Sequence, residues 1–188
     1  MAIKIYVDQG HNPQNPNAGA EGSGLREQDI VFRVGIELAE LLRQNPDFEV
    51  RLSRPTAETQ IGTSNAESLR LRVADANQWG ADWYISLHTN ASEQASATGS
   101  EAFVFSLGTP AAALATDMLA ALQEETGLRN RGVFSRPSLY VLKRTTMPAV
   151  LMELGFISNP RDARLMNESP SLFARGLYNG IVAYTGLA

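Results

Sequence analysis

The sequence contains no cysteine. This absence excludes disulfide bonds, thiolate nucleophiles and cysteine-ligated zinc sites. No stretch approaches the roughly 20 apolar residues of a membrane helix, so we expect no membrane insertion. Histidine is almost as scarce as cysteine, because the 188 residues include two. Each histidine therefore merits attention as a candidate functional residue.

A secretory signal and a basic surface are not visible either. Lys4 interrupts the N-terminus, and the apolar run IYV is much shorter than the roughly 7–15 residues of a signal-peptide core. The net charge is -4 and the basic residues are scattered, so we expect no nucleic-acid partner. A length of 188 residues with 44% hydrophobic residues predicts one globular domain that spans residues 1–188.

Hydrophobic periodicity predicts an alternation of strands and helices. A long loop rich in Gly, Asn and Pro, at 10–24, separates the first strand from the first helix. The predicted strands are 3–7, 48–52, 83–87, 102–105, 139–142 and 149–153. The predicted helices run from about 29 to 45, 66–79, 110–125, a short turn from 159, and 170–184. This order predicts a single α/β domain with an open, twisted, mostly parallel central sheet and helices on both faces.

Polar side chains follow three of the predicted strands. Asp8 and His11 come after the first strand, and His88 and Asn90 follow the strand 83–87. Glu153 ends the strand 149–153. In open α/β sheets the ligand site lies beyond the carboxyl ends of the strands. We therefore expect both histidines and Glu153 to meet at one edge of the sheet.

Two imidazoles and one carboxylate form a ligand set that suits Zn²⁺ and leaves a position for water. A second carboxylate could then act as the base. Spacing alone leaves open whether Glu27 or Glu153 is the ligand. Glu27 by itself resembles an acid in the first turn of a helix, where the helix dipole favours it. Glu153 lies within AVLMELGF, where burial of an acid is costly unless it has a partner or a task.

Each polar residue also has a structural interpretation. A single histidine at a strand end is more often a hydrogen-bonded structural residue than a metal ligand. Asn90 could cap the turn after its strand. Arg54, Arg70 and Arg72 are expected on a solvated face or in structural ion pairs.

Four segments together resemble one protein family. In chain order they are VDQGH, GLREQD, ISLHTN and NRGVFSRPSLYVLKRTTMPAVLMELGFISNPRD. They are similar to segments of the zinc-dependent N-acetylmuramoyl-L-alanine amidases of the Amidase_3 type, the catalytic domains of bacterial and phage cell-wall lysins. The resemblance extends from about residue 3 to 184. It implies an open α/β fold and hydrolysis of the amide between the lactyl group of N-acetylmuramic acid and L-alanine.

The resemblance also assigns roles to individual residues. His11, Glu27 and His88 match the ligands of one Zn²⁺ per chain, and Glu153 matches the catalytic glutamate. The structural interpretation of Glu27 is thereby replaced by that of a metal ligand. The implied partner is peptidoglycan or a muropeptide. The resemblance also implies that the protein is a monomer and acts on the cell wall, in an extracellular or periplasmic location.

The resemblance also suggests substrate contacts. Asn90, Asn130 and Arg131 are candidates, because the family presents these loops around its groove. Two departures from the family pattern are Asn12, where Gly is common, and Thr89, where a small residue is usual. The first of them affects the expected shape of the groove near the metal.

Some family members carry an inserted helix that blocks the zinc. The connection between His88 and residue 102 is too short for such a helix, so we expect an open groove. Two other functions are compatible with the same residues. One is a zinc amidohydrolase or peptidase that cleaves a different bond, and the other is a wall-binding module without turnover. Retention of Glu153 argues against the second.

Overall fold

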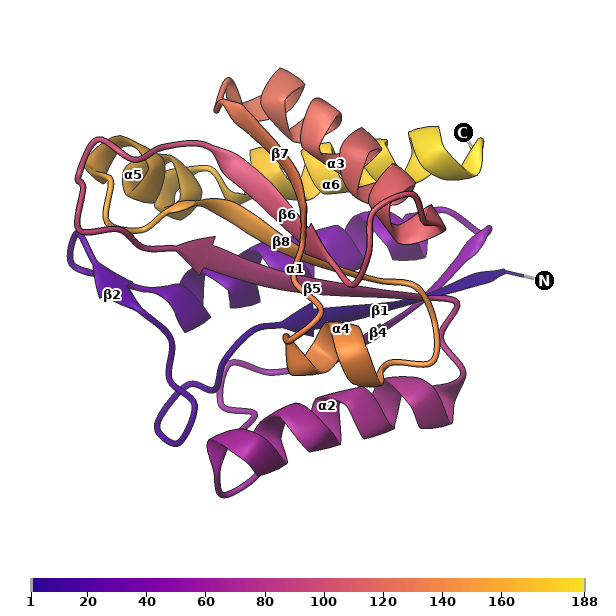
Figure 1. Cartoon of the computed structure of the whole chain (residues 1–188). Helices are drawn as coiled ribbons and strands as arrows, with labels where there is room; N and C mark the ends of the chain where they lie inside the picture. Colours follow the sequence, from indigo (N-terminus) through magenta and orange to yellow (C-terminus); the bar gives the residue numbers. More distant parts are fainter. Residues whose placement is uncertain (1, 188) are drawn as a thin grey trace.

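The computed structural model describes residues 2–187, and a six-stranded sheet forms its centre (Figure 1). The strand order is β4-β1-β5-β8-β6-β7. The strands are β1 (Ile3–Gln9), β4 (Phe48–Leu52), β5 (Trp83–Asn90), β6 (Ser100–Val104), β7 (Asn130–Ser135) and β8 (Ala149–Phe156). All neighbouring pairs are parallel except β6 and β8. The predicted single-domain α/β class with a mostly parallel sheet is confirmed.

Helices cover both faces of this sheet. They are α1 (Glu27–Gln44), α2 (Asn65–Trp79), α3 (Pro110–Thr126), α4 (Tyr140–Arg144), α5 (Pro160–Glu168) and α6 (Pro170–Thr185). One apolar core joins α1, α3 and α6 to one face, and a smaller core joins α2 and α4 to the other (Figure 1). None of the described helices combines the length and apolar character that a membrane span needs.

The helix α2 shows how local sequence sets these elements. Ser64 accepts a hydrogen bond from the Glu67 amide at 3.1 Å, as the S-x-x-E pattern predicts. The Glu67 carboxylate in turn accepts from the Thr63 amide at 2.8 Å. Gly80 ends the helix with φ of 68°, a conformation that other residues adopt at a cost.

The strand predicted at 139–142 is wrong, because residue 139 caps helix α4 and residues 140–142 are part of that helix. Val141 and Leu142 are consecutive and both buried in the core beneath α2. A strand would direct them to opposite faces, whereas a helical turn places both against the sheet and α2. Both sides of β8 are moreover already paired, with β5 and β6.

Other boundaries also differ from the sequence-based expectation. The strand β7 and the short hairpin of β2 (Glu21–Gly22) and β3 (Leu25–Arg26) were not predicted. The strands β5 and β8 continue beyond their predicted ends at 87 and 153, since their pairing persists to Asn90 and Phe156. His88 and Asn90 therefore lie within β5 and do not follow it, and Glu153 lies inside β8 and not at its end.

Candidate active site

Two histidines and one glutamate meet where β1, β5 and α1 come together. The distance between His11 Nε2 and His88 Nδ1 is 3.1 Å. The Glu27 carboxylate lies 3.2 Å from His11 Nε2 and 3.1 Å from His88 Nδ1. Ligand atoms around a tetrahedral zinc, each about 2.0–2.1 Å from the metal, are about 3.3 Å apart. The donor atoms present here therefore fit a zinc ion in both type and spacing.

Backbone amides fix the orientation of the Glu27 carboxylate. Ala20 donates to Oε2 and Thr89 donates to Oε1, each at 2.9 Å. Burial acts to raise the pKa of Glu27, but hydrogen bonds and positive charge from His11 and His88 outweigh it and lower that pKa below its usual range. Glu27 is thereby held as a carboxylate, the form that binds a metal.

Two glycines leave the room that these side chains occupy. A Cβ at Gly19 would lie 2.8 Å from both Glu27 Oε2 and His11 Cδ2. A Cβ at Gly10 would lie 2.5 Å from His88 Cε1. The chain is therefore shaped around the imidazoles and the carboxylate, which supports the assignment of this cluster as a built metal site.

The backbone of His11 has a left-handed conformation, with φ of 66°. The side chain of Arg72 holds this backbone in place through hydrogen bonds. The Arg72 guanidinium donates to the carbonyl of His11, to that of Gln9 at 2.7 Å, and to Asp8 at 2.6 Å. Arg72 is 2% exposed, so the structural ion pair is the correct interpretation of this residue and the solvated face is wrong. Arg54 is buried too, and Arg70 is exposed.

Glu153 lies on β8 beside the metal cluster, because it is the cross-strand partner of His88. Its atom Oε2 is buried and has no hydrogen-bond partner among residues 2–187. Burial, helped by the carboxylates of Glu27 and Glu101, raises the pKa of Glu153 to about 8, although Arg136 opposes the shift. An unpaired acid with a pKa near neutrality is suited to accept and release a proton.

The three predicted substrate contacts fall in two groups. Asn90 donates to Glu101 at 2.7 Å, and Arg131 donates to the same carboxylate at 2.6 Å. Glu101 is the cross-strand partner of Glu153, so both side chains lie next to the catalytic candidate. Asn130 instead accepts from the Gly132 amide at 2.9 Å at the start of β7.

Glu101 is a residue that sequence reasoning missed. It is buried within the strand SEAFV, and the same argument that singled out Glu153 applies to it. The predicted strand began at residue 102 and so excluded it. A wider search for acids inside apolar strands would have found Glu101.

A cavity of about 240 Å³ adjoins the metal cluster. His11 and His88 line it together with Leu69, Leu139 and Leu151. Both imidazoles retain 20% exposure, and the chain between β5 and β6 forms no helix, as the prediction of an open groove requires.

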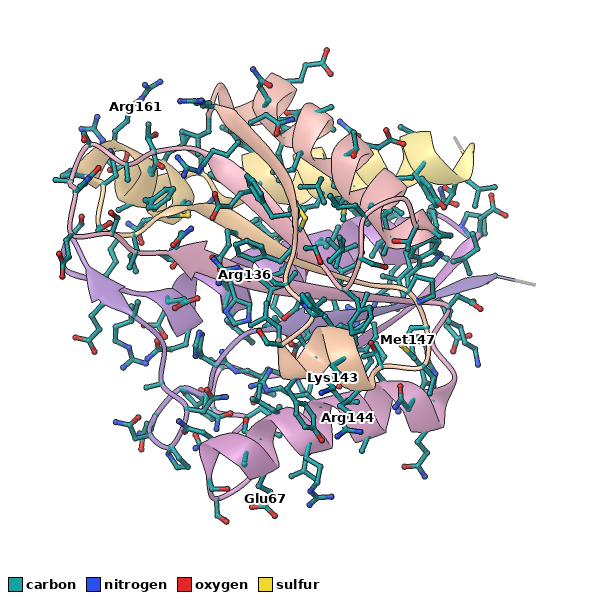
Figure 2. The ribbon with its side chains drawn as sticks, viewed as in Figure 1. Glu67, Arg136, Lys143, Arg144, Met147 and Arg161 are labelled. Atoms are coloured by element: carbon teal, nitrogen blue, oxygen red, sulfur yellow. The ribbon has the colours of Figure 1, made fainter. Side chains whose placement is uncertain are left out.

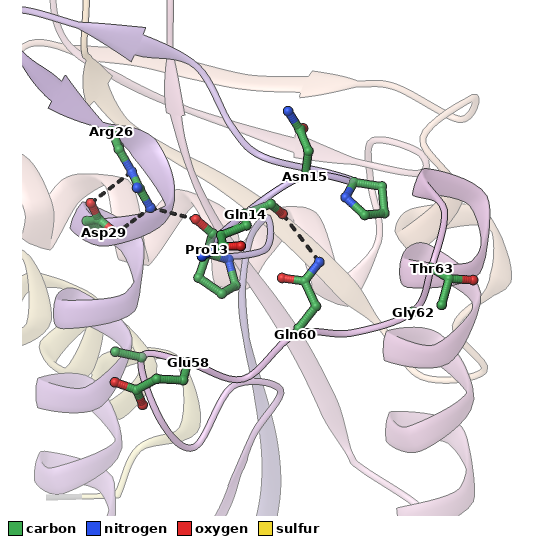
Figure 3. Close-up of a pocket in the computed structure, with 11 residues that line it drawn as sticks. Pro13, Gln14, Asn15, Arg26, Asp29, Glu58, Gln60, Gly62 and Thr63 are labelled. Carbon is green, nitrogen blue, oxygen red and sulfur yellow. Dashed lines mark hydrogen bonds and ion pairs between the residues drawn. The ribbon is translucent and has the colours of Figure 1, made fainter.

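A second depression, of about 650 Å³, lies between the loop after His11 and the segment 57–63 (Figure 3). Two of its charged groups pair with each other, since Arg26 lies 3.1 Å from Asp29, and Arg26 also donates to the Pro13 carbonyl at 2.6 Å. Asn12 is buried beside it and joins the loop to Ile61 through hydrogen bonds of 3.0 and 3.1 Å. The asparagine that departs from the family pattern therefore anchors this loop.

Comparison with known proteins gives consistent results. The family model described as Amidase_3, N-acetylmuramoyl-L-alanine amidase, matches residues 5–183. The amidase CwlM of Bacillus licheniformis is 32% identical over 95% of this chain and 67% of its own length. The catalytic domain of CwlV from Bacillus (Paenibacillus) polymyxa has a TM-score of 0.86 at 28% identity, over 99% of both chains. The CwlD amidase of Clostridioides difficile, solved in complex with the GerS lipoprotein, has a TM-score of 0.89 at 25% identity, over 99% of this chain and 100% of CwlD.

Proposed function

Because the chain belongs to the N-acetylmuramoyl-L-alanine amidase family, we propose that His11, Glu27 and His88 bind one zinc ion and that Glu153 is the catalytic residue. The protein is a cell-wall hydrolase that cleaves the amide between N-acetylmuramic acid and L-alanine. The assignment of roles to individual residues is the part that needs testing.

The observation that carries this proposal is the spacing of the three donor side chains, whose nearest atoms are 3.1–3.2 Å apart. Neutral imidazoles and a carboxylate match the preference of zinc in hydrolases. When bound, zinc supplies Lewis acidity toward a carbonyl oxygen and toward water. The rest of the chemistry falls to the side chains of the protein.

Glu153 is the group placed to move the proton. Its unpartnered Oε2 can accept a proton from the attacking water, and the same carboxyl can then donate it to the leaving nitrogen of L-alanine. Its pKa of about 8 allows both the charged and the neutral form near neutral pH. Glu27, which the histidines keep ionised, is less suited to this task.

The further parts of the proposal concern the substrate and its setting. The chain acts as one catalytic domain, residues 1–188, and as a monomer on peptidoglycan or muropeptides in an extracellular or periplasmic location. Asn90, Asn130 and Arg131 contact the substrate. The link from Asn90 and Arg131 to Glu101 supports this for those two residues.

The zinc assignment is tested by metal content. Mass spectrometry of purified protein should find about one zinc per chain in the wild type and a loss of zinc in His11→Ala and His88→Ala. Glu27→Gln should also lose zinc, whereas the matched control Glu21→Gln, an exposed acid in the same segment, should retain it. Gly19→Ala should lose zinc although no ligand is removed, because its Cβ would lie 2.8 Å from Glu27 Oε2.

A folded wild type that takes up no zinc, even after incubation with the metal, would overturn the proposed site. The reaction is tested separately on digested wall. Cleavage should release free stem peptides that begin with a new amino group on L-alanine. Release of any other peptide end would instead indicate a peptidase that cuts elsewhere.

A further inference from the structure

Among residues 2–187, no helix covers the face of β6 and β7 that lies on the same side of the sheet as α2 and α4. The smaller core beneath α2 and α4 includes Leu151 of β8 and Phe103 of β6. Side chains alternate along a strand, so Glu153 and Glu101, each two residues away, lie on that same face. In Figure 1, α4 lies in front of β1 and β4, whereas no described helix lies in front of β6 and β7. Glu153 therefore lies at the margin of an open platform.

Two aromatic rings form the floor of this platform. Phe103 and Phe134 are cross-strand partners, and their ring centroids are 6.3 Å apart. Phe103 is 6% exposed, but Phe134 is 45% exposed, which is unusual for a large apolar side chain in a strand. Exposed aromatic surface beside a catalytic group favours a ligand with apolar parts.

Arg136 follows β7, and its guanidinium lies over the ring of Phe103. Its amide donates to the Val104 carbonyl at 2.8 Å, which continues the pairing of β7 with β6. Its guanidinium carbon is 4.5 Å from the ring centroid of Phe103, a distance typical of cation–π stacking. Figure 2 shows Arg136 in front of the sheet, between β7 and α4. The stacking therefore fixes the position of the Arg136 side chain, although this side chain is exposed to solvent.

The charge of Arg136 has no partner of its own. Among residues 2–187, Arg131 of β7 pairs with Glu101 at 2.6 Å, but no ion pair includes Arg136. The sequence between Glu125 and Glu153 contains no acid and five cations, at Arg129, Arg131, Arg136, Lys143 and Arg144. Arg136 also acts to lower the pKa of Glu153, so the positive charge of Arg136 influences the catalytic carboxyl group. A planar guanidinium with free donors suits a carboxylate.

We propose that Arg136, stacked on Phe103, binds a carboxylate that the stem peptide carries beyond its L-alanine. This subsite rests on the function proposed above. Glu153 must reach the leaving nitrogen of L-alanine, so the peptide continues from that point across the open face of β6 and β7. Its carboxylate then meets Arg136, and its aliphatic groups lie against Phe134.

The test compares a muramoyl peptide that has free peptide carboxylates with its carboxamide analogue. The wild type should show kcat/KM about tenfold to a hundredfold higher for the carboxylate form, the range expected of a charge-assisted hydrogen bond. Arg136→Gln should abolish that discrimination. Arg136→Lys should restore part of it, since the charge is kept and the planar fork is lost. Lys143→Gln, which removes a nearby exposed cation on α4, should leave the ratio as in the wild type.

Equilibrium binding gives a readout that does not depend on turnover. The released stem peptide should bind Arg136→Gln about tenfold or more weakly than the wild type in its carboxylate form, and the two proteins should bind its carboxamide form alike. Phe134→Ala should weaken the binding of both forms by the same factor, because it removes apolar contact and no charge.

Two results would overturn the subsite. One is a wild type that cleaves both substrates equally well, and the other is an Arg136→Gln protein that loses the same factor on both. Either result leaves the amidase assignment intact, because both forms are still cleaved. A zinc-loaded wild type that cleaves neither form would overturn the proposed function and the subsite together.

Discussion

Two carboxylates, the buried Asp8 and the partly buried Glu153, lie two strands apart on the same face of the sheet and have opposite surroundings. Asp8 on β1 lies under α2, where Arg72 donates to it at 2.6 Å and Ser86 at 2.7 Å. Burial acts to raise the pKa of Asp8, but the charge and hydrogen bonds of Arg72 and Ser86 outweigh it and lower that pKa. Within residues 2–187, no group forms a hydrogen bond with the buried Oε2 of Glu153 on β8, and burial raises the pKa of Glu153 to about 8.

The difference follows from what covers each part of the sheet. Where α2 closes the face, the chain supplies a cation and hydroxyl groups, so the acid there stays ionised and stabilises the fold. Where the face is open, the acid is left without a partner, which costs stability and preserves reactivity. The covered half of this face therefore has a structural role, and the open half is available to substrate.

The largest expected effect comes from Glu153→Gln. This variant keeps the shape of the side chain but removes proton transfer, so hydrolysis should be about 10²–10⁴-fold slower. Its zinc content should match the wild type, and its free energy of unfolding should be equal or higher, since an unpaired buried acid is removed. Hydrolysis of muropeptides, metal analysis and urea unfolding measure the three quantities.

The matched control is Glu67→Gln, which alters a half-exposed acid in the first turn of α2 (Figure 2). It should leave hydrolysis close to that of the wild type. If Glu153→Gln hydrolysed muropeptides as fast as the control, Glu153 could not be the group that moves the proton. The contrast between a structural Asp8 and a catalytic Glu153 would then be wrong.

The variant Arg72→Met tests the part of the sheet face that α2 covers. It leaves Asp8 buried and unpaired, so the free energy of unfolding should fall by about 3–5 kcal/mol, as for other broken buried ion pairs. The double variant Asp8→Asn/Arg72→Met should lose less than the sum of the two single variants, because no lone charge remains. Additive losses in urea unfolding would show that the two side chains do not act as a pair.

The sequence predicted the convergence at the sheet edge better than it predicted the elements around it. Parallel strands end at the same edge, so His11 and His88 could be expected to meet, and the structure brings them together. The part played by Glu27 was not visible in the spacing, because an acid in a first helical turn has an ordinary electrostatic explanation. For that residue the family resemblance was necessary.

The remaining errors have tertiary causes. The segment NRGVFS reads as a loop because it contains Asn and Gly, yet it forms β7 since β6 offers an open edge for pairing. The short apolar run 139–142 is compatible with a buried strand, but most of it folds as a helical turn, because β8 has no free edge. Such choices depend on which neighbours a segment meets, and local patterns do not contain that information.

The smallest expected effect is a change in the stability of Asp8→Asn relative to the wild type at acid pH. It tests whether Asp8, unlike Glu153, stabilises the fold through its charge. The pKa of Asp8 in the folded protein is lower than the ordinary value of about 3.9. Ionised Asp8 therefore raises the free energy of unfolding at pH values above about 3.9, and this contribution is lost as the pH falls through the folded-state pKa. Asp8→Asn should therefore be less stable than the wild type at pH 7, and the gap should narrow below about pH 4. Urea unfolding of the metal-free proteins between pH 7 and 3 measures this, with the exposed Asp47→Asn as the control that shows no such narrowing. A gap that stayed constant down to pH 3 would mean that Asp8 stabilises the fold through the shape of its hydrogen bonds and not through its charge.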